Sequence, residues 1–91
     1  MTMLPGGRQG MKQLFLIFGG PSKERFVSVA SAQNLLPWIV EPTCWFWHAG
    51  GEVTQVAAWE LERHARPFDD AFVPATSPTW PSLEFALDTV A

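Results

Sequence analysis

The segment that most constrains the fold is a glycine turn between an apolar run and a helical pattern. Five consecutive apolar residues, 14–18, precede Gly19 and Gly20, and a stretch with helical periodicity runs from Val27 to Leu36. Two adjacent glycines let the backbone turn sharply, because they tolerate positive φ and carry no side chain. The pattern predicts a strand, a tight turn and a helix whose N-terminus faces the ligand crevice of an α/β sheet.

Composition restricts the class of protein and its partners. A chain of 91 residues, 47 % of them hydrophobic, can bury one modest core and is too apolar to stay disordered. The net charge of −3 without a basic block argues against nucleic acid as a partner. No stretch reaches the roughly 20 apolar residues that span a bilayer, so we expect no membrane partner. Because only 16 % of residues are charged, we expect a further subunit or domain to cover part of the surface.

Periodicity and turn residues predict an α/β fold in which strands alternate with helices, and such alternation favours a parallel or mixed sheet. The predicted strands are 14–18, 43–48, 52–56 and a short one at 71–73. The first predicted helix ends near 36, and the other two are at 57–65 and 83–90. Ser22 and Ser82 are the expected N-caps of the first and last helices. We expect residues 1–10 to be a flexible leader and residues 11–91 to form the domain.

The second predicted strand is unusually aromatic. Strand alternation places Trp45 and Trp47 on one side and Cys44 and Phe46 on the other. A tryptophan pair can stack on a base or a sugar, but packing inside the core or an interface is the favoured interpretation. Cys44 is the single cysteine, which excludes an internal disulfide and fits a reducing, cytoplasmic location. We expect its thiol to be buried and inert.

Other ligand motifs are weak. Neither the dinucleotide fingerprint nor the Walker loop follows the first strand. His48 and His64 lie far apart, and Cys44 with His48 supplies at most two zinc ligands, so we expect no metal site. The pair at 69–70 is interpreted as solvated acids rather than a cation site.

Two interpretations of the glycine turn remain. The first is a structural turn with a solvated cap, in which Ser22 only caps the helix. The second is a site in which Glu24, at the helix N-terminus, holds an ammonium group by a charge-assisted hydrogen bond. Ser22 and Ser28 then shape the loop or bond to Glu24. Lys23 and Arg25 are expected to be solvated or paired with acids of a neighbouring domain.

Residues 16–31 resemble the N-terminal signature of D-alanine–D-alanine ligases, a strand followed by Gly-Gly-x-Ser-x-Glu-x-x-Val-Ser-x-x-Ser. Here the signature is carried by Gly19, Gly20, Ser22, Glu24, Val27, Ser28 and Ser31. The chain departs from the family at Phe26, where an acidic or polar residue is usual. A weaker likeness continues toward the C-terminus.

The resemblance implies a Rossmann-like three-layer domain with a mainly parallel sheet, of the type that precedes an ATP-grasp module. It implies Glu24 as the catalytic residue that holds the amino group of the first D-alanine. The residues implied in substrate binding are Glu24, Ser22, Ser28, Gly19, Gly20 and Val27, with no metal ligand. ATP and Mg²⁺ are expected on ATP-grasp domains of the same or a partner chain, within a homodimer that makes peptidoglycan precursors.

The chain itself shows no ATP-grasp residues, so we expect it to be inactive alone, as a fragment or one part of a split enzyme. A different interpretation is a non-catalytic Rossmann-like interaction module that packs its aromatic strand on a partner subunit. A third, a small nucleotide-binding domain, is disfavoured by the missing phosphate loop.

Overall fold

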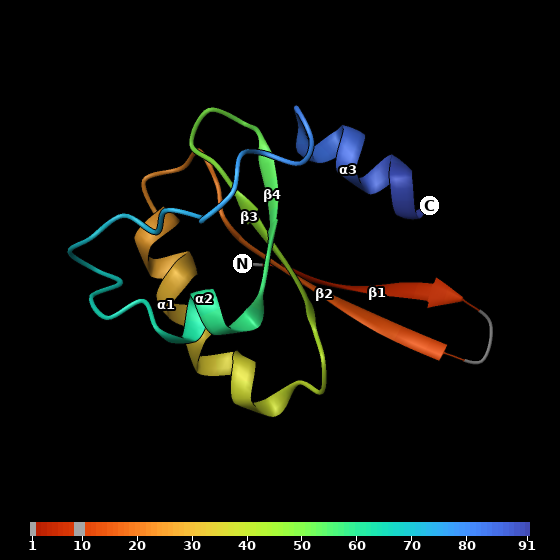
Figure 1. Ribbon diagram of the computed structural model, residues 1–91, viewed down its shortest axis with the longest axis horizontal. Helices are drawn as coiled ribbons and strands as arrows, with labels where there is room; N and C mark the ends of the chain where they lie inside the picture. Colours follow the sequence, from red (N-terminus) through yellow and green to blue (C-terminus); the bar gives the residue numbers. More distant parts are fainter. Residues whose placement is uncertain (1, 9–10) are drawn as a thin grey trace.

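Four strands form one mixed sheet in the order β1-β2-β3-β4 (Figure 1). The computed structural model describes residues 2–8 and 11–91, with side chains from residue 13 onward. The strands are β1 (Thr2–Arg8), β2 (Met11–Gly19), β3 (Thr43–Trp47) and β4 (Val53–Val56). β2 and β3 are parallel, whereas β1–β2 and β3–β4 are antiparallel pairs.

The mixed α/β class is confirmed, but the expectation of a mainly parallel sheet is wrong. Among the described strands, only β2 and β3 are joined by a helical crossover, which a parallel pair requires. Short connections join β1 to β2 and β3 to β4, and a short connection between neighbouring strands produces an antiparallel pair. The hairpin predicted at 49–51 between two of these strands is therefore present.

The first strand falls where a flexible leader was expected. Residues 2–8 pair with β2 in a register that runs from Thr2↔Ile17 to Arg8↔Met11. β3 occupies one side of β2 and leaves the other side for this pairing. β1 lies at the sheet edge, and edge strands are where proline is tolerated within a sheet, which fits the position of Pro5. The leader residues 1, 9 and 10 lie outside the described residues.

In the described part of the chain, three α-helices flank the sheet: α1 (Arg25–Leu35), α2 (Ala58–Glu62) and α3 (Leu83–Val90). A 3₁₀ turn, η1 (Leu36–Trp38), follows α1 and contains Pro37, so the predicted end of this helix is confirmed. Ser82 caps α3 as predicted, since its hydroxyl accepts from the Phe85 N–H at 3.0 Å. Within the described ranges, no helix is long and apolar enough to cross a bilayer.

The predicted strand at 71–73 does not form. Phe72 instead inserts its ring among Phe18 and Phe46, at centroid distances of 5.5 and 5.0 Å. The place beside β4 is taken by Trp80, which forms a two-way backbone bridge with Val53 at 3.0 Å each way. The packing of the Phe72 ring thus anchors this segment without strand pairing, while Ala71 and Val73 stay exposed.

The sheet separates two apolar clusters, as the alternation along β3 predicts. One face carries Cys44 and Phe46 beneath α1, α2 and Phe72. The opposite face carries Trp45 and Trp47 with Trp80 and α3, and Figure 1 shows α3 apart from α1 and α2.

Candidate functional site

The turn after β2 is built against the end of β3. Gly19 and Gly20 have φ values of 92° and 99°, and the Gly20 N–H donates to the Trp47 carbonyl at 2.7 Å. A Cβ on Gly19 would lie 2.6 Å from that same oxygen and 2.7 Å from the Phe46 ring. Both glycines are therefore required by backbone conformation and by the close approach of β3.

The two serines of the turn shape the loop. The Ser22 hydroxyl accepts from the Glu24 N–H at 3.1 Å, and the buried Ser28 hydroxyl accepts from the Gly19 N–H at 3.0 Å. Ser22 was expected to be the N-cap, but α1 begins at Arg25 and Glu24 occupies the cap position. Ser22 still bonds an amide two residues ahead, which tightens the turn before the helix.

Glu24 lies at the mouth of the fold with its side chain exposed. Its backbone carbonyl accepts from the Ser28 N–H at 2.9 Å, while its carboxylate makes no capping hydrogen bond to α1. Val27, the remaining residue implied in substrate binding, is 46 % exposed on the same helix. The turn thus brings all six predicted site residues together and leaves the carboxylate in solvent.

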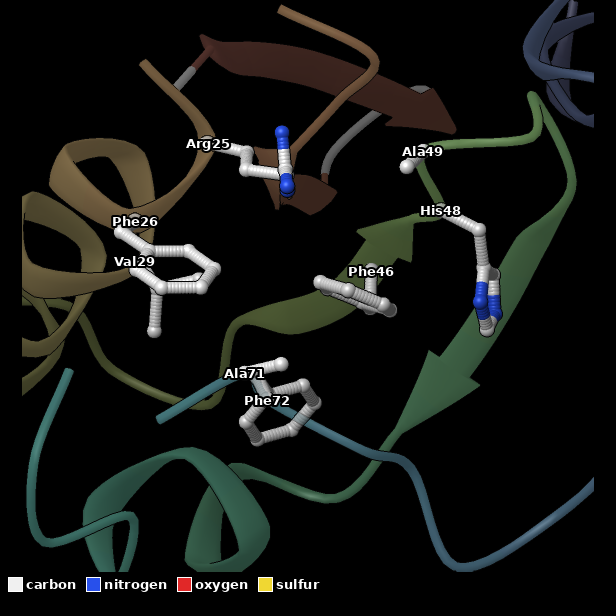
Figure 2. Close-up of a pocket in the computed structure, with 8 residues that line it drawn as sticks. All are labelled: Arg25, Phe26, Val29, Phe46, His48, Ala49, Ala71 and Phe72. Carbon is white, nitrogen blue, oxygen red and sulfur yellow. The ribbon is translucent and has the colours of Figure 1, made fainter. Parts of the chain in front are cut away.

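A cavity of about 180 Å³ opens beside this turn, between the first turns of α1, the end of β3 and the 71–72 segment (Figure 2). Its lining residues are Arg25, Phe26, Val29, Phe46, His48, Ala49, Ala71 and Phe72. None of the six predicted site residues lines it. The predicted carboxylate and the cavity are therefore neighbouring features of one sheet edge.

The cavity has an aromatic base and one cation. Val29, Phe46 and Phe72 are buried at its base, and the Arg25 guanidinium carbon lies 5.4 Å from the centre of the Phe26 ring. The His48 ring packs edge-on against Phe46 with centroids 4.7 Å apart. Its Nε2 shares a hydrogen bond of 2.6 Å with the buried Thr54 hydroxyl, which fixes the ring.

Sequence reasoning missed the lining residues, although a signal for some of them was present. β2 and β3 are parallel, and Gly19 is paired with Trp47, so their carboxyl ends meet at one edge. His48 directly follows the second of these strands, and Arg25 begins the helix that follows the first. Phe72 had no such signal, because it reaches the cavity from an irregular segment.

The Cys44 thiol is buried, as predicted. Desolvation by burial, and to a lesser degree the charge of Glu62, raise its pKa from 9.0 to about 11. A thiol with this pKa stays protonated at neutral pH and is a poor nucleophile. The structure therefore gives Cys44 a packing role.

The histidines and paired acids have ordinary protein partners. His64 Nε2 lies 2.9 Å from the Asp70 carbonyl oxygen, and Arg66 forms an exposed ion pair with Asp69 at 3.1 Å. Across residues 2–8 and 11–91, no three His, Cys, Asp or Glu side chains are grouped as metal ligands.

The tryptophan pair of β3 consists of a buried Trp45 and a partly buried Trp47. Trp45 is 1 % exposed, and its indole N–H donates to Gln55 Oε1 at 3.3 Å. The Trp47 indole N–H donates to the Gly51 carbonyl at 3.2 Å. The packing interpretation is confirmed for Trp45, whose ring has no face open to a base or sugar.

No family model, curated protein or solved structure matches this chain. The residues of the turn and the cavity are therefore the features that bear on function.

Proposed function

We propose that this chain is the N-terminal, Rossmann-like three-layer domain of an ATP-dependent D-alanine–D-alanine ligase. The observation that carries the proposal is the position of Glu24, an exposed carboxylate at the start of α1, directly beyond the glycine turn. Helices on both faces of the sheet are consistent with the three-layer type. In the ligase signature that residues 16–31 resemble, the glutamate at this position holds the amino group of the substrate.

In this proposal Glu24 holds the ammonium group of the first D-alanine. A carboxylate and an ammonium group form a charge-assisted hydrogen bond, and the positive end of α1 favours an anion at this position. Ser22 and Ser28 fix the turn through the Glu24 and Gly19 amides. The side chain is therefore carried on a rigid backbone while it stays accessible to substrate.

ATP and Mg²⁺ belong to ATP-grasp domains of the same or a partner chain. Transfer of the γ-phosphoryl group of ATP to the first carboxylate would release ADP and give an acyl phosphate. The unprotonated amine of the second D-alanine would then attack the acyl carbon and expel inorganic phosphate. The present residues supply only the amino-group end of the site, within a homodimeric, cytoplasmic enzyme of peptidoglycan precursor synthesis.

The first experiment measures ATP-dependent phosphate release by the isolated chain in the presence of D-alanine. We expect no activity, because the nucleotide and metal are bound elsewhere. Turnover by the isolated chain would contradict this division of the active site.

The second experiment introduces Glu24→Gln in the assembly that includes the ATP-grasp domains. Loss of a hydrogen bond between charged groups costs about 1.5–3 kcal/mol, so KM for the first D-alanine should rise roughly ten- to a hundredfold. Glu84→Gln, an exposed substitution in the first turn of α3, is the matched control. Equal KM values for the two variants would exclude the assigned role of Glu24.

The alternative interaction module needs a different surface from the one first expected. Trp45 and Phe46 of β3 are buried and Trp47 is partly buried, whereas Trp38 and Val40 after α1 are 84 % and 89 % exposed. In that alternative Trp38→Ser weakens partner binding and Glu24→Gln leaves it unchanged. In a ligase domain, Glu24→Gln weakens D-alanine binding and Trp38→Ser leaves it unchanged.

The nucleotide-binding interpretation has an additional obstacle at the turn. The Gly19 N–H donates to Ser28 and the Gly20 N–H donates to Trp47. Neither amide is left to cradle a phosphate in the manner of a phosphate-binding loop. Binding of labelled ATP to the chain would restore this interpretation.

A further inference from the structure

The cavity beside the glycine turn has a size and polarity that the proposed ligase chemistry does not use. Its volume is about 180 Å³, whereas drug-sized ligands fill pockets of about 300–1,000 Å³. The space therefore suits a small organic molecule.

The base of the cavity favours an apolar group. Phe46 and Phe72 are 9 % and 6 % exposed, and their ring centroids lie 5.0 Å apart at an angle of 56°. Val29, 3 % exposed, completes this base from α1. A compact ring or a branched aliphatic group placed here loses apolar surface to carbon atoms on several sides.

The mouth of the cavity favours an anion. Arg25 is the one charged side chain among the lining residues, and Figure 2 shows its guanidinium directed across the opening between Phe26 and Ala49. The Phe26 ring supports it from one side, and one of its N–H groups lies 3.4 Å from the Ser22 carbonyl. A planar guanidinium with outward N–H groups matches the two oxygens of a carboxylate.

The acids nearest in sequence do not cancel this charge inside the cavity. Glu24 and Asp70 are exposed and do not line it, and Asp69 is paired with Arg66. An ammonium group inside would have no acidic partner, and burying an unpaired charge is costly. The ligand class is therefore a carboxylate without an amine, which separates it from D-alanine.

We propose that this cavity binds a small monocarboxylate that carries one compact apolar group. The carboxylate lies on the Arg25 guanidinium, and the apolar group rests on Phe46 and Phe72. Phe26 contributes by supporting the guanidinium, which an acidic residue at this position would neutralise. The site works independently of Glu24 and of the proposed ligase reaction.

Benzoate, benzamide and benzylamine test the proposal, because they share a ring and differ in charge. We expect benzoate to shift the NMR resonances of Phe26, Phe46, His48 and Phe72 in the unmodified chain. Benzamide should bind at least tenfold more weakly, and benzylamine should cause no saturable shift. Equal binding of benzoate and benzamide, shifts confined to other residues, or no shift up to the solubility limit of benzoate would overturn the proposal.

Three exposed substitutions complete the test without disturbing the core. Arg25→Gln should weaken benzoate binding by about tenfold or more, as expected for the loss of a charge-assisted contact. Lys23→Gln removes a neighbouring cation outside the lining and should leave binding unchanged. If Arg25→Gln and Lys23→Gln weakened benzoate binding equally, the binding would be nonspecific charge attraction and the proposed site would be rejected. Glu24→Gln should also leave benzoate binding unchanged, so failure of this site and failure of the ligase proposal are told apart.

Discussion

The two faces of the sheet are covered in different ways. On the α3 side, Trp45 is 1 % exposed and packs against the rings of Phe15 and Trp80, each at a centroid distance of 4.9 Å. On the α1 side, Phe46 and Phe72 are also in contact, yet a cavity remains above them where α1 begins.

The difference shows how one strand can serve both packing and binding. Alternation along β3 sends large rings to both faces, and the glycine turn meets both: Gly19 lies against Phe46 on the α1 side and Gly20 against Trp47 on the α3 side. The cavity lies on the α1 side, where α1 begins beside Phe46 and Phe72. One face is thus closed by aromatic packing, and the other retains room for a ligand.

The largest expected effect is on the closed face. Trp45→Ala removes a ring that is packed on all sides, so the free energy of unfolding should fall by about 3–5 kcal/mol. Phe46→Ala should cost at least about 1 kcal/mol less, because its ring already borders a cavity. Urea unfolding followed by circular dichroism measures both, and equal costs would remove the distinction between the faces.

A smaller loss is expected when the glycine turn is given a side chain. Gly19→Ala combines an unfavourable positive φ with a contact of 2.6 Å to a backbone oxygen, and should cost about 2–3 kcal/mol. Gly51→Ala is the matched control, since it has φ +104° and nothing within 4 Å of its Cβ. It should show the backbone strain alone. Thermal unfolding compares them, and an equal loss at Gly51 would refute the importance of the β3 contact.

The buried thiol beneath α1 gives a pH-dependent effect. The folded chain keeps the Cys44 proton up to a pKa of about 11, whereas the unfolded chain releases it near the ordinary value of 9.0. Over this interval the folded state binds more protons, so stability is retained below pH 9 and falls as pH rises to 11. The expected loss is on the order of 1–3 kcal/mol.

Cys44→Ala provides the control for this titration, because it removes the thiol and should flatten that part of the stability curve. Urea midpoints at several pH values measure the effect. A curve that falls equally in both proteins would assign the dependence to other groups.

The smallest predicted effect concerns the hydroxyl that fixes the turn. Ser28→Ala leaves the Gly19 N–H without its acceptor and should cost about 1 kcal/mol. Ser31→Ala, one turn further along α1, should stay within about 0.5 kcal/mol of the parent. Hydrogen exchange at the Gly19 amide gives a local measurement, and unchanged protection in Ser28→Ala would contradict the assigned contact.

The sequence predicted local features well where one residue type permits one conformation. Gly19 and Gly20 marked the turn, Pro37 ended the helix, and Ser82 marked the start of α3. The alternation along β3 correctly placed Trp45 and Cys44 on opposite faces, because a strand has a period of two.

Pairing and cavity formation were harder to predict, because both depend on residues distant in sequence. The edge of β2 was filled by residues 2–8, whose Pro5 and two glycines are poor strand formers on local criteria. Phe72 and Arg25 become neighbours only after α1, β3 and the 71–72 segment pack together. Local patterns therefore found Glu24 and its turn, while the adjacent cavity became visible only in three dimensions.

The backbone bridge between Trp80 and Val53 also has a consequence for contacts between molecules. An exposed strand margin can recruit a strand from another chain and begin aggregation. Trp80 occupies both ladder groups of Val53, and Pro81 follows at once with no N–H to extend the row. The backbone of Trp80 therefore covers this part of the sheet edge, while its side chain packs in the core. We expect this cover to disfavour pairing with a strand of another molecule.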